Sequence, residues 1–167
     1  MIELKEGDLA VVKTNSKIAG AINAGQRFLS KDGKAEYNHA LLIVDGNGGT
    51  YESLAKIDHY HISQYLGCPV WIVRHVGMDG EKFRKGYEAV LKYDGKLYPG
   101  WRLPMHFVGL AKFIHWSYPV CSELVGRFLY GAGLFNATGW GWSPDDLADL
   151  WRESKYYETV YKGVLTA

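Results

Sequence analysis

The chain has 167 residues, 47% of them hydrophobic, and this length predicts one compact domain over residues 1–167 with a single core. Its 19 Lys and Arg residues balance 18 Asp and Glu residues without a basic run or an acidic tail, which excludes the charge pattern of a nucleic-acid binder. No apolar stretch has the length of a signal peptide or a spanning helix, so we expect a cytoplasmic protein without a transmembrane segment.

The first half of the chain predicts a strand, a helix and a buried hairpin. Residues 8–12 have the pattern of a short strand, and Ser16 is a suitable N-cap for the helix that follows. Residues 39–44 are too uniformly apolar for a half-exposed strand, and the Asp-Gly-Asn-Gly-Gly turn after them leads to a second strand at 50–52. His39 therefore opens the first strand of this hairpin.

The second half predicts further strands and helices around the same core. Residues 70–73 form a strand, and Asp79 can cap a helix whose apolar face carries Phe83, Tyr87, Val90 and Leu91. Residues 143–146, Ser-Pro-Asp-Asp, supply an N-cap, a proline at the first helical position and two first-turn acids, so they predict a helix start. A final strand over 156–161 completes the sheet.

The segment around Cys121 predicts a thiol at the start of a helix. Proline is tolerated in the first turn of a helix but not in its interior, so the apolar-periodic run from Cys121 onward begins at about Pro119 or Val120. A helix N-terminus favours a thiolate, and its free N–H groups can hold an oxyanion. Spacing alone supports a core cysteine equally well, because Cys121 is in phase with apolar residues. Two cysteines are too few for a disulfide framework, although a Cys68–Cys121 bridge stays an alternative.

Several short segments resemble the NlpC-type papain-like peptidases. Residues 120–125, Val-Cys-Ser-Glu-Leu-Val, resemble their Cys-Ser-x-Leu-Val helix start, and residues 7–9 and 39–46 resemble their Gly-Asp-Leu and His-strand segments. In ordinary members the cysteine helix precedes these strands, whereas here it follows them, which is the order of the circularly permuted branch that includes YiiX-like hydrolases and the lecithin:retinol acyltransferase group. Residues 143–147 also resemble a Pro-x-Asp-Leu element found late in YiiX-like chains. The resemblance implies an α+β, permuted papain-like fold, with a small antiparallel sheet packed against the cysteine-bearing helix and flanking helices.

The resemblance also implies the roles of three residues. Cys121 would be the nucleophile, His39 the general base and Glu52 the carboxylate that orients the imidazole. Imidazole suits the removal of a thiol proton near neutral pH, but a lone histidine is more often structural, and without the resemblance Glu52 is better explained as an exposed strand acid. The chain departs from the family at Val120, where Asp is usual, and at Glu123, where Gly is usual, and these departures leave the substrate class open.

Polar and aromatic side chains near these residues are candidates for substrate contacts. Gln26, Asn38 and Tyr118 are candidates for a second oxyanion donor, although each fits a turn, a cap or the surface equally well. The chain has six Trp and 12 Tyr, most of which we expect in the core. Trp116 and Tyr118 lie just ahead of the cysteine and are the better candidates for lining a pocket.

A competing chemistry is metal binding by a histidine-rich segment. His59-Tyr60-His61 places two imidazoles on the same face of an extended segment, with other ligand types nearby in sequence at Asp58, Cys68 and His75. The spacing matches no recognised metal motif, and a polar edge strand explains it better. We therefore expect no metal and no cofactor.

The sequence thus predicts a cysteine-dependent hydrolase of the peptidase or amidase type, acting on peptide amides such as those of peptidoglycan through a thioacyl intermediate. One alternative is a lipid- or thioester-directed acyl hydrolase or acyltransferase. The other is a non-catalytic binding domain in which Cys121 is inert. The expected partner is a peptide, amide or acyl-ester substrate, and the sequence leaves the oligomeric state open.

Overall fold

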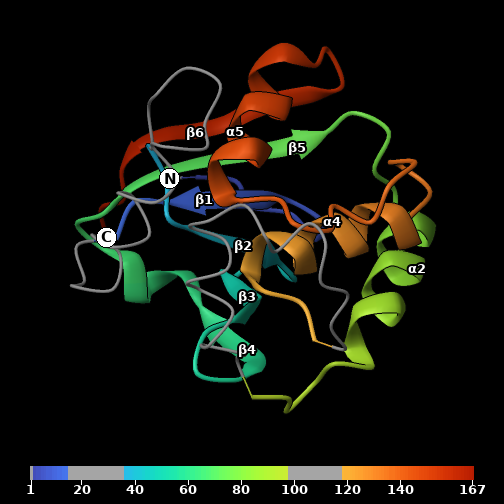
Figure 1. Cartoon of the computed structure of the whole chain (residues 1–167). Coiled ribbons are helices and arrows are strands. Elements are labelled where there is room, and N and C mark those ends of the chain that lie inside the picture. Colours follow the sequence, from blue (N-terminus) through green and yellow to red (C-terminus); the bar gives the residue numbers. More distant parts are fainter. Residues whose placement is uncertain (1, 15–35, 98–117) are drawn as a thin grey trace.

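The computed structural model describes residues 2–14, 36–97 and 118–167, which form a six-stranded antiparallel sheet and three α-helices (Figure 1). The strands, in chain order, are β1 (Leu9–Val12), β2 (His39–Ile43), β3 (Gly49–Ser53), β4 (Ile57–His61), β5 (Pro69–His75) and β6 (Tyr157–Val164). Their order across the sheet is β4-β3-β2-β1-β5-β6. The helices are α2 (Gly80–Leu91), α4 (Cys121–Gly131) and α5 (Pro144–Glu153), together with a 3-10 turn, η1 (Ile62–Tyr65).

The central strands β1 and β2 are buried on both faces, as their uniformly apolar sequences predict. Every residue of both strands is buried, and the two strands pair directly, with Leu9 opposite Leu42. Because side chains alternate along a strand, Leu9 and Leu42 pack against the helices, whereas Leu41 and Ile43 face a second apolar cluster. That second cluster includes Ile62 and Tyr65 of η1.

The three helices cover one face of the sheet (Figure 1). Helix α4 packs on β2 and β3, α5 contacts β1, and α2 lies beside α4. The approach of α2 to α4 is close because Gly86 faces Phe128, where an added Cβ would lie 2.7 Å from the Phe128 carbonyl oxygen. This packing fixes α4, and with it the start of the helix at Cys121, against the hairpin strands.

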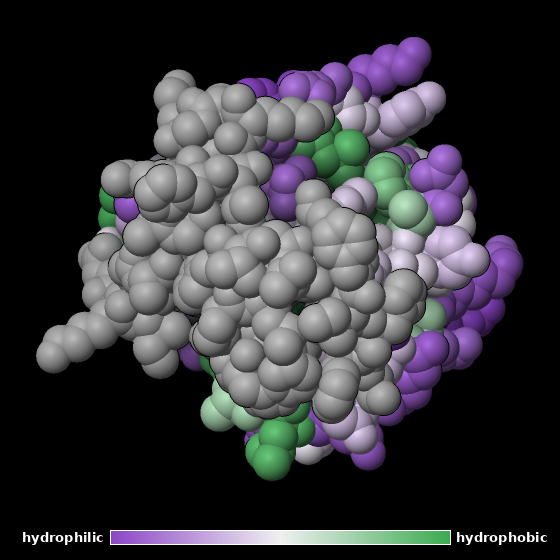
Figure 2. Space-filling model, in the orientation of Figure 1, coloured by the Kyte–Doolittle hydropathy of each residue, from purple (hydrophilic) through white to green (hydrophobic). Residues whose placement is uncertain are grey.

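Helix α2 confirms the amphipathic pattern read from the sequence, with one exception. The Asp79 side chain caps it by accepting the Lys82 N–H at 2.8 Å, and Val90 is fully buried. Leu91, placed on the apolar face from its spacing, is 37% exposed, although Val90 beside it and Tyr93 just after the helix are buried. The hydrophilic solvent side of α2 is visible at the right of Figure 2, where acids and bases are mixed.

Most predicted elements in the described residues are confirmed, with shifted boundaries. The cysteine helix begins at Cys121 with Val120 as N-cap, so Pro119 lies before the helix and not in its first turn. The segment around His59 is indeed an edge strand, β4. The helix expected after Ser16 lies outside the described residues. Within those residues, no helix combines the length and hydropathy needed to cross a bilayer.

Candidate functional site

The β2–β3 hairpin brings His39 and Glu52 together. The strands pair antiparallel with Leu42 opposite Tyr51, so the alternation of side chains places His39 and Glu52 on the same face. The His39 Nε2 lies 2.6 Å from the Glu52 Oε2. Both side chains are withdrawn from solvent, with His39 7% and Glu52 0% exposed, so the alternative of an exposed strand acid is wrong.

The Glu52 carboxylate is held by neutral donors besides His39. Its Oε1 accepts from the Thr50 hydroxyl at 2.6 Å and from the Gln64 amide at 2.8 Å, and its Oε2 accepts from the Tyr65 hydroxyl. Burial raises the pKa of this carboxyl, but the hydrogen bond and charge of His39, with the bonds from Thr50 and Tyr65, lower it below its ordinary value. Glu52 is therefore an ionised carboxylate whose orientation is fixed.

Helix α4 carries Cys121 to the same imidazole from a distant part of the sequence. Cys121 is the first residue of the helix and is 7% exposed. Just before it, the Pro119 carbonyl oxygen accepts a 3.4 Å hydrogen bond from the hydroxyl of Ser53 at the end of β3. The start of the helix is thus attached to the strand that carries Glu52.

The pKa of His39 reflects its position between Cys121 and Glu52. Burial alone lowers the pKa of this imidazole, but the charge and side-chain hydrogen bond of Cys121, followed by those of Glu52, raise the pKa to about 10. Because Nε2 is occupied by Glu52, Nδ1 is the ring nitrogen left for Cys121. The arrangement favours an imidazolium that lies between the Cys121 side chain and the Glu52 carboxylate.

The first turn of α4 leaves the backbone amide of the cysteine without an acceptor among the described residues. Val120, the N-cap residue, has no side-chain acceptor, and the Glu123 carboxylate instead accepts the Val120 N–H at 3.1 Å. No acceptor among residues 2–14, 36–97 and 118–167 meets the Cys121 N–H. An unpaired amide beside a buried thiol is the group that could receive an oxyanion.

The remaining predicted contact residues are not brought together in the described part of the chain. The Asn38 side chain is hydrogen-bonded to Thr14. Its Oδ1 accepts from the Thr14 N–H at 2.9 Å and from the Thr14 hydroxyl at 3.0 Å, and its Nδ2 donates to the Thr14 carbonyl oxygen at 2.9 Å. The ring of Tyr118 lies under the Lys96 ammonium, 5.7 Å from the ring centre. Gln26 and Trp116 lie outside the described residues. A second oxyanion donor stays a prediction.

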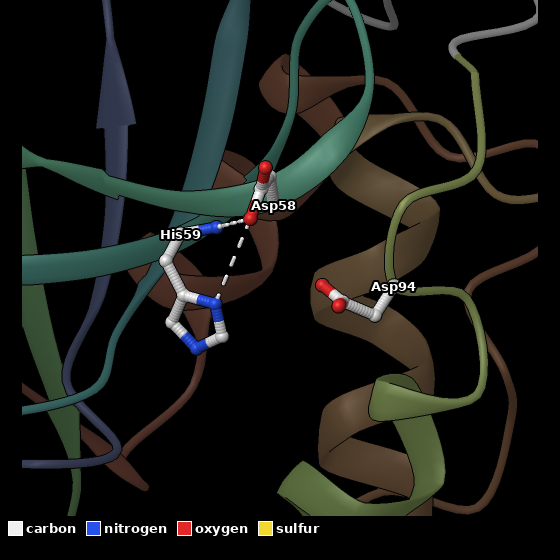
Figure 3. A group of neighbouring side chains, drawn as sticks. All are labelled: Asp58, His59 and Asp94. Carbon is white, nitrogen blue, oxygen red and sulfur yellow. Dashed lines mark hydrogen bonds and ion pairs between the residues drawn. The ribbon is translucent and has the colours of Figure 1, made fainter.

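One group in the described residues combines side chains of the kind that bind metals: Asp58, His59 and Asp94, named here the β4 cluster (Figure 3). Figure 3 shows the Asp94 carboxylate pointing toward His59 from the turn after α2. The His59 Nδ1 lies 3.8 Å from the Asp58 Oδ1, beyond the roughly 3 to 3.5 Å that separates neighbouring ligands of one zinc ion. The Lys56 ammonium is already paired with Asp58, and the Tyr87 hydroxyl is bonded to the His59 Nε2. As placed, two of the three side chains of the β4 cluster are engaged by other partners, so a bound ion would have to compete with Lys56 and Tyr87.

The other residues considered for metal binding have separate environments. His61 bonds the Ser63 hydroxyl and the Asn47 carbonyl, and His75 packs between Tyr156 and Tyr157. Cys68 and Cys121 are both free thiols, so the alternative of a bridge between them is wrong.

Sequence reasoning missed the residues that hold Glu52. Thr50 had a usable signal, because it precedes Glu52 by two residues on the same strand and so shares its face. Gln64 and Tyr65 lie in η1, which the chain reaches only after β4, and nothing in their spacing points to Glu52. The Tyr65 ring also packs against His39, with 5.7 Å between ring centres.

Comparisons with known proteins support the fold. Neither a protein-family model nor a curated protein sequence matches the chain. Among solved structures, the chain resembles the crystal structure of metalloprotein YiiX from Escherichia coli O157:H7, with a TM-score of 0.62 and 17% identity, over 98% of this chain and 99% of that chain. At this identity the likeness shows the fold alone, a mixed α+β arrangement like that of YiiX. The description as a metalloprotein belongs to YiiX.

Proposed function

We propose that this protein is a cysteine-dependent hydrolase of the amidase or peptidase type, in which Cys121 is the nucleophile, His39 the general base and Glu52 the orienting carboxylate. The observation that carries the proposal is the buried His39 imidazole, which interacts with Cys121 on one side and lies 2.6 Å from Glu52 on the other. Three buried titratable groups from different elements in this order match the logic of a nucleophile, a base and an orienting acid.

The chemistry follows from these positions. The Cys121 thiolate attacks the carbonyl carbon, and the carbonyl oxygen becomes an oxyanion that accepts the free Cys121 N–H. When the carbon–nitrogen bond breaks, the His39 imidazolium gives its proton to the leaving amine and a thioester remains on Cys121. Water then attacks the thioester while His39 takes a proton, and the acid product leaves with the thiolate restored. Glu52 keeps the imidazole oriented throughout.

We also propose that the chain has the permuted papain-like topology, forms a single domain and acts in the cytoplasm. The cysteine helix follows the histidine strand in this chain, which is the order expected of the permuted papain-like branch. We place the activity in one domain over residues 1–167 and in the cytoplasm. Peptide amides, such as those of peptidoglycan-like peptides, are the proposed substrate class, and no cofactor takes part in the steps above.

Two other functions use the same site differently. A lipid- or thioester-directed acyl hydrolase or acyltransferase would form the same thioacyl intermediate from another donor, so the acyl group is what separates it from an amidase. A binding domain that retains the fold would leave Cys121 unmodified by any acyl donor.

A covalent-intermediate assay tests the proposal. The protein is mixed with a peptide anilide, an acyl p-nitrophenyl ester and an acyl thioester, and the intact mass is measured after rapid acid quench. We expect an added acyl mass on Cys121, and its loss in Cys121→Ala and His39→Ala. Cys68→Ala is the matched control, because it removes the other free thiol of the chain and should leave the adduct in place.

The pattern of donors decides among the functions. Acylation by the anilide supports the amidase, whereas acylation by the ester and thioester alone supports the acyl-directed alternative. A folded protein that no donor acylates at Cys121 would contradict a catalytic function and favour the binding domain.

A further inference from the structure

We propose that Glu123 is a positioning residue for the Cys121 site, an inference that rests on the hydrolase function proposed above. Glu123 is fully buried two residues after Cys121. Its Oε2 accepts the Val120 N–H at 3.1 Å and its Oε1 accepts the Gly141 N–H at 3.0 Å. The burial of a carboxylate is costly unless hydrogen bonds compensate it, and here both oxygens bind backbone amides. Glu123 therefore joins the start of α4 to the chain that leads into α5.

The position of Glu123 explains how helix α4 begins although its N-cap residue, Val120, has no side chain that can accept a hydrogen bond. Helices usually begin with a Ser, Thr, Asp or Asn N-cap, whose side chain accepts an amide of the first turn. Val120 cannot do so, and Glu123 instead reaches back to the amide of the N-cap residue itself. The N-cap backbone is held in place, while the Cys121 N–H, which no acceptor in the described part of the chain engages, is available to an oxyanion. Val120 and Glu123, which both differ from the residues usual in NlpC-type chains, thus form one arrangement.

The segment on the other side of Glu123 lies tightly against the same turn of α4. The Ser122 hydroxyl donates to the Trp142 carbonyl oxygen at 2.6 Å. A Cβ added to Gly126 would lie 2.7 Å from the Thr138 carbonyl oxygen, so here the helix meets backbone and not flexible side chains. Removing the Glu123 carboxylate would leave two backbone amides without their acceptor inside this contact. Both segments would then shift, and the Cys121 N–H would shift with them.

This role predicts a difference between two reactions of the same thiol. Acylation passes through an oxyanion and depends on the position of the Cys121 N–H. Alkylation by iodoacetamide displaces iodide from a saturated carbon and forms no oxyanion, so it depends on the thiolate alone. In Glu123→Gln, one side-chain oxygen still accepts an amide, but the new NH2 group faces the other amide. Glu123→Gln should therefore slow acylation far more than alkylation.

The experiment measures both rates on Cys121 at one pH, with p-nitrophenyl acetate as the acyl donor and iodoacetamide as the alkylating agent. In Glu123→Gln we expect acylation to fall about 10- to 100-fold, in line with the effect of misplaced or lost oxyanion donors, and alkylation to change less than about 3-fold. The matched control is Asp146→Asn. Asp146 occupies the same third position of α5 and accepts the N-cap amide of Ser143 at 2.7 Å, far along the chain from Cys121. In this variant both rates should stay close to those of the wild type.

Each result decides the proposal. A wild-type rate of acylation in Glu123→Gln, or an equal fall in both rates, would overturn the positioning role and leave Glu123 as a structural residue. A wild type that is alkylated at Cys121 but never acylated would contradict the hydrolase function first, and the positioning role with it. If Glu123→Gln does not fold, Glu123→Asp keeps the charge, shortens the reach and gives the same comparison of rates.

Discussion

Replacement of Cys121 by alanine should lower the pKa of His39. In the wild type this pKa is raised from 6.5 to about 10 against the effect of burial, which corresponds to about 5 kcal/mol in favour of the imidazolium. The charge and hydrogen bond of Cys121 outrank those of Glu52 among the effects that raise it. An opposite charge within 4 to 6 Å shifts a pKa by roughly 1 to 3 units, so Cys121→Ala should lower the His39 pKa by at least about 1 unit.

The assay is an NMR titration of the imidazole nitrogens, with the His39 signals assigned by their loss in His39→Gln. Cys68→Ala is the control and should leave the His39 titration unchanged. A His39 pKa that is the same in the wild type and in Cys121→Ala would refute the reasoning. So would an equal decrease in Cys68→Ala.

The raised His39 pKa also links protonation to stability. Because the folded-state pKa lies above the unfolded value of 6.5, the contribution of His39 is fully present below pH 6.5 and is lost as the pH rises toward 10. The free energy of unfolding should therefore decrease more between pH 7 and pH 10 in the wild type than in His39→Gln, which lacks the titrating imidazole.

Three further predictions follow from the contacts described above. Glu52→Gln should remain folded, as measured by thermal melting, but its rate of ester hydrolysis should fall about tenfold, less than the fall of about 100-fold or more in His39→Ala. Wild-type activity in Glu52→Gln would show that Glu52 takes no part in the site. Gly86→Ala should destabilise the protein by about 1 to 3 kcal/mol in urea, because its Cβ would collide with Phe128. In the same helix a Cβ on Gly80 would meet the Glu6 carboxylate at 3.8 Å, an ordinary contact, so Gly80→Ala should change little; equal stability of the two variants would contradict the close packing of α2 on α4. EDTA should change neither hydrolysis nor the melting temperature, because the proposed site uses no metal. One equivalent of zinc bound at the β4 cluster would contradict this prediction.

Much of the fold could be predicted where the signals are local. The buried hairpin followed from an apolar run and a glycine-rich turn, and the caps at Asp79 and Ser143 were identified from residue type and position. Each of these features involves residues within a few positions of one another, so the sequence alone contains the interaction. The prediction for Leu91 was wrong because spacing gives only the approximate width of a buried face, and here the boundary of that face falls between Val90 and Leu91.

The site was less accessible to sequence reasoning because its contacts join distant segments. The resemblance to NlpC-type chains singled out Cys121, His39 and Glu52, but spacing alone supported a core cysteine and an exposed acid. Besides His39 and Thr50, the buried Glu52 carboxylate binds Gln64 and Tyr65, which supply donors from a turn beyond the next strand. A local pattern cannot show that a carboxylate has acquired such donors, and so it cannot tell a buried acid from a surface one.

The central claim, that Cys121 is a thiolate activated by His39, is tested most directly by iodoacetamide labelling against pH, read by peptide mass spectrometry. A free thiol, with a pKa of about 8.5, is less than about 1% thiolate at pH 6. Facing the His39 imidazolium, Cys121 should label faster than Cys68 at pH 6 in the folded protein, and His39→Ala should abolish the difference. If Cys121 labels no faster than Cys68 at pH 6, and His39→Ala changes nothing, then Cys121 is a core residue and the binding-domain function replaces the hydrolase.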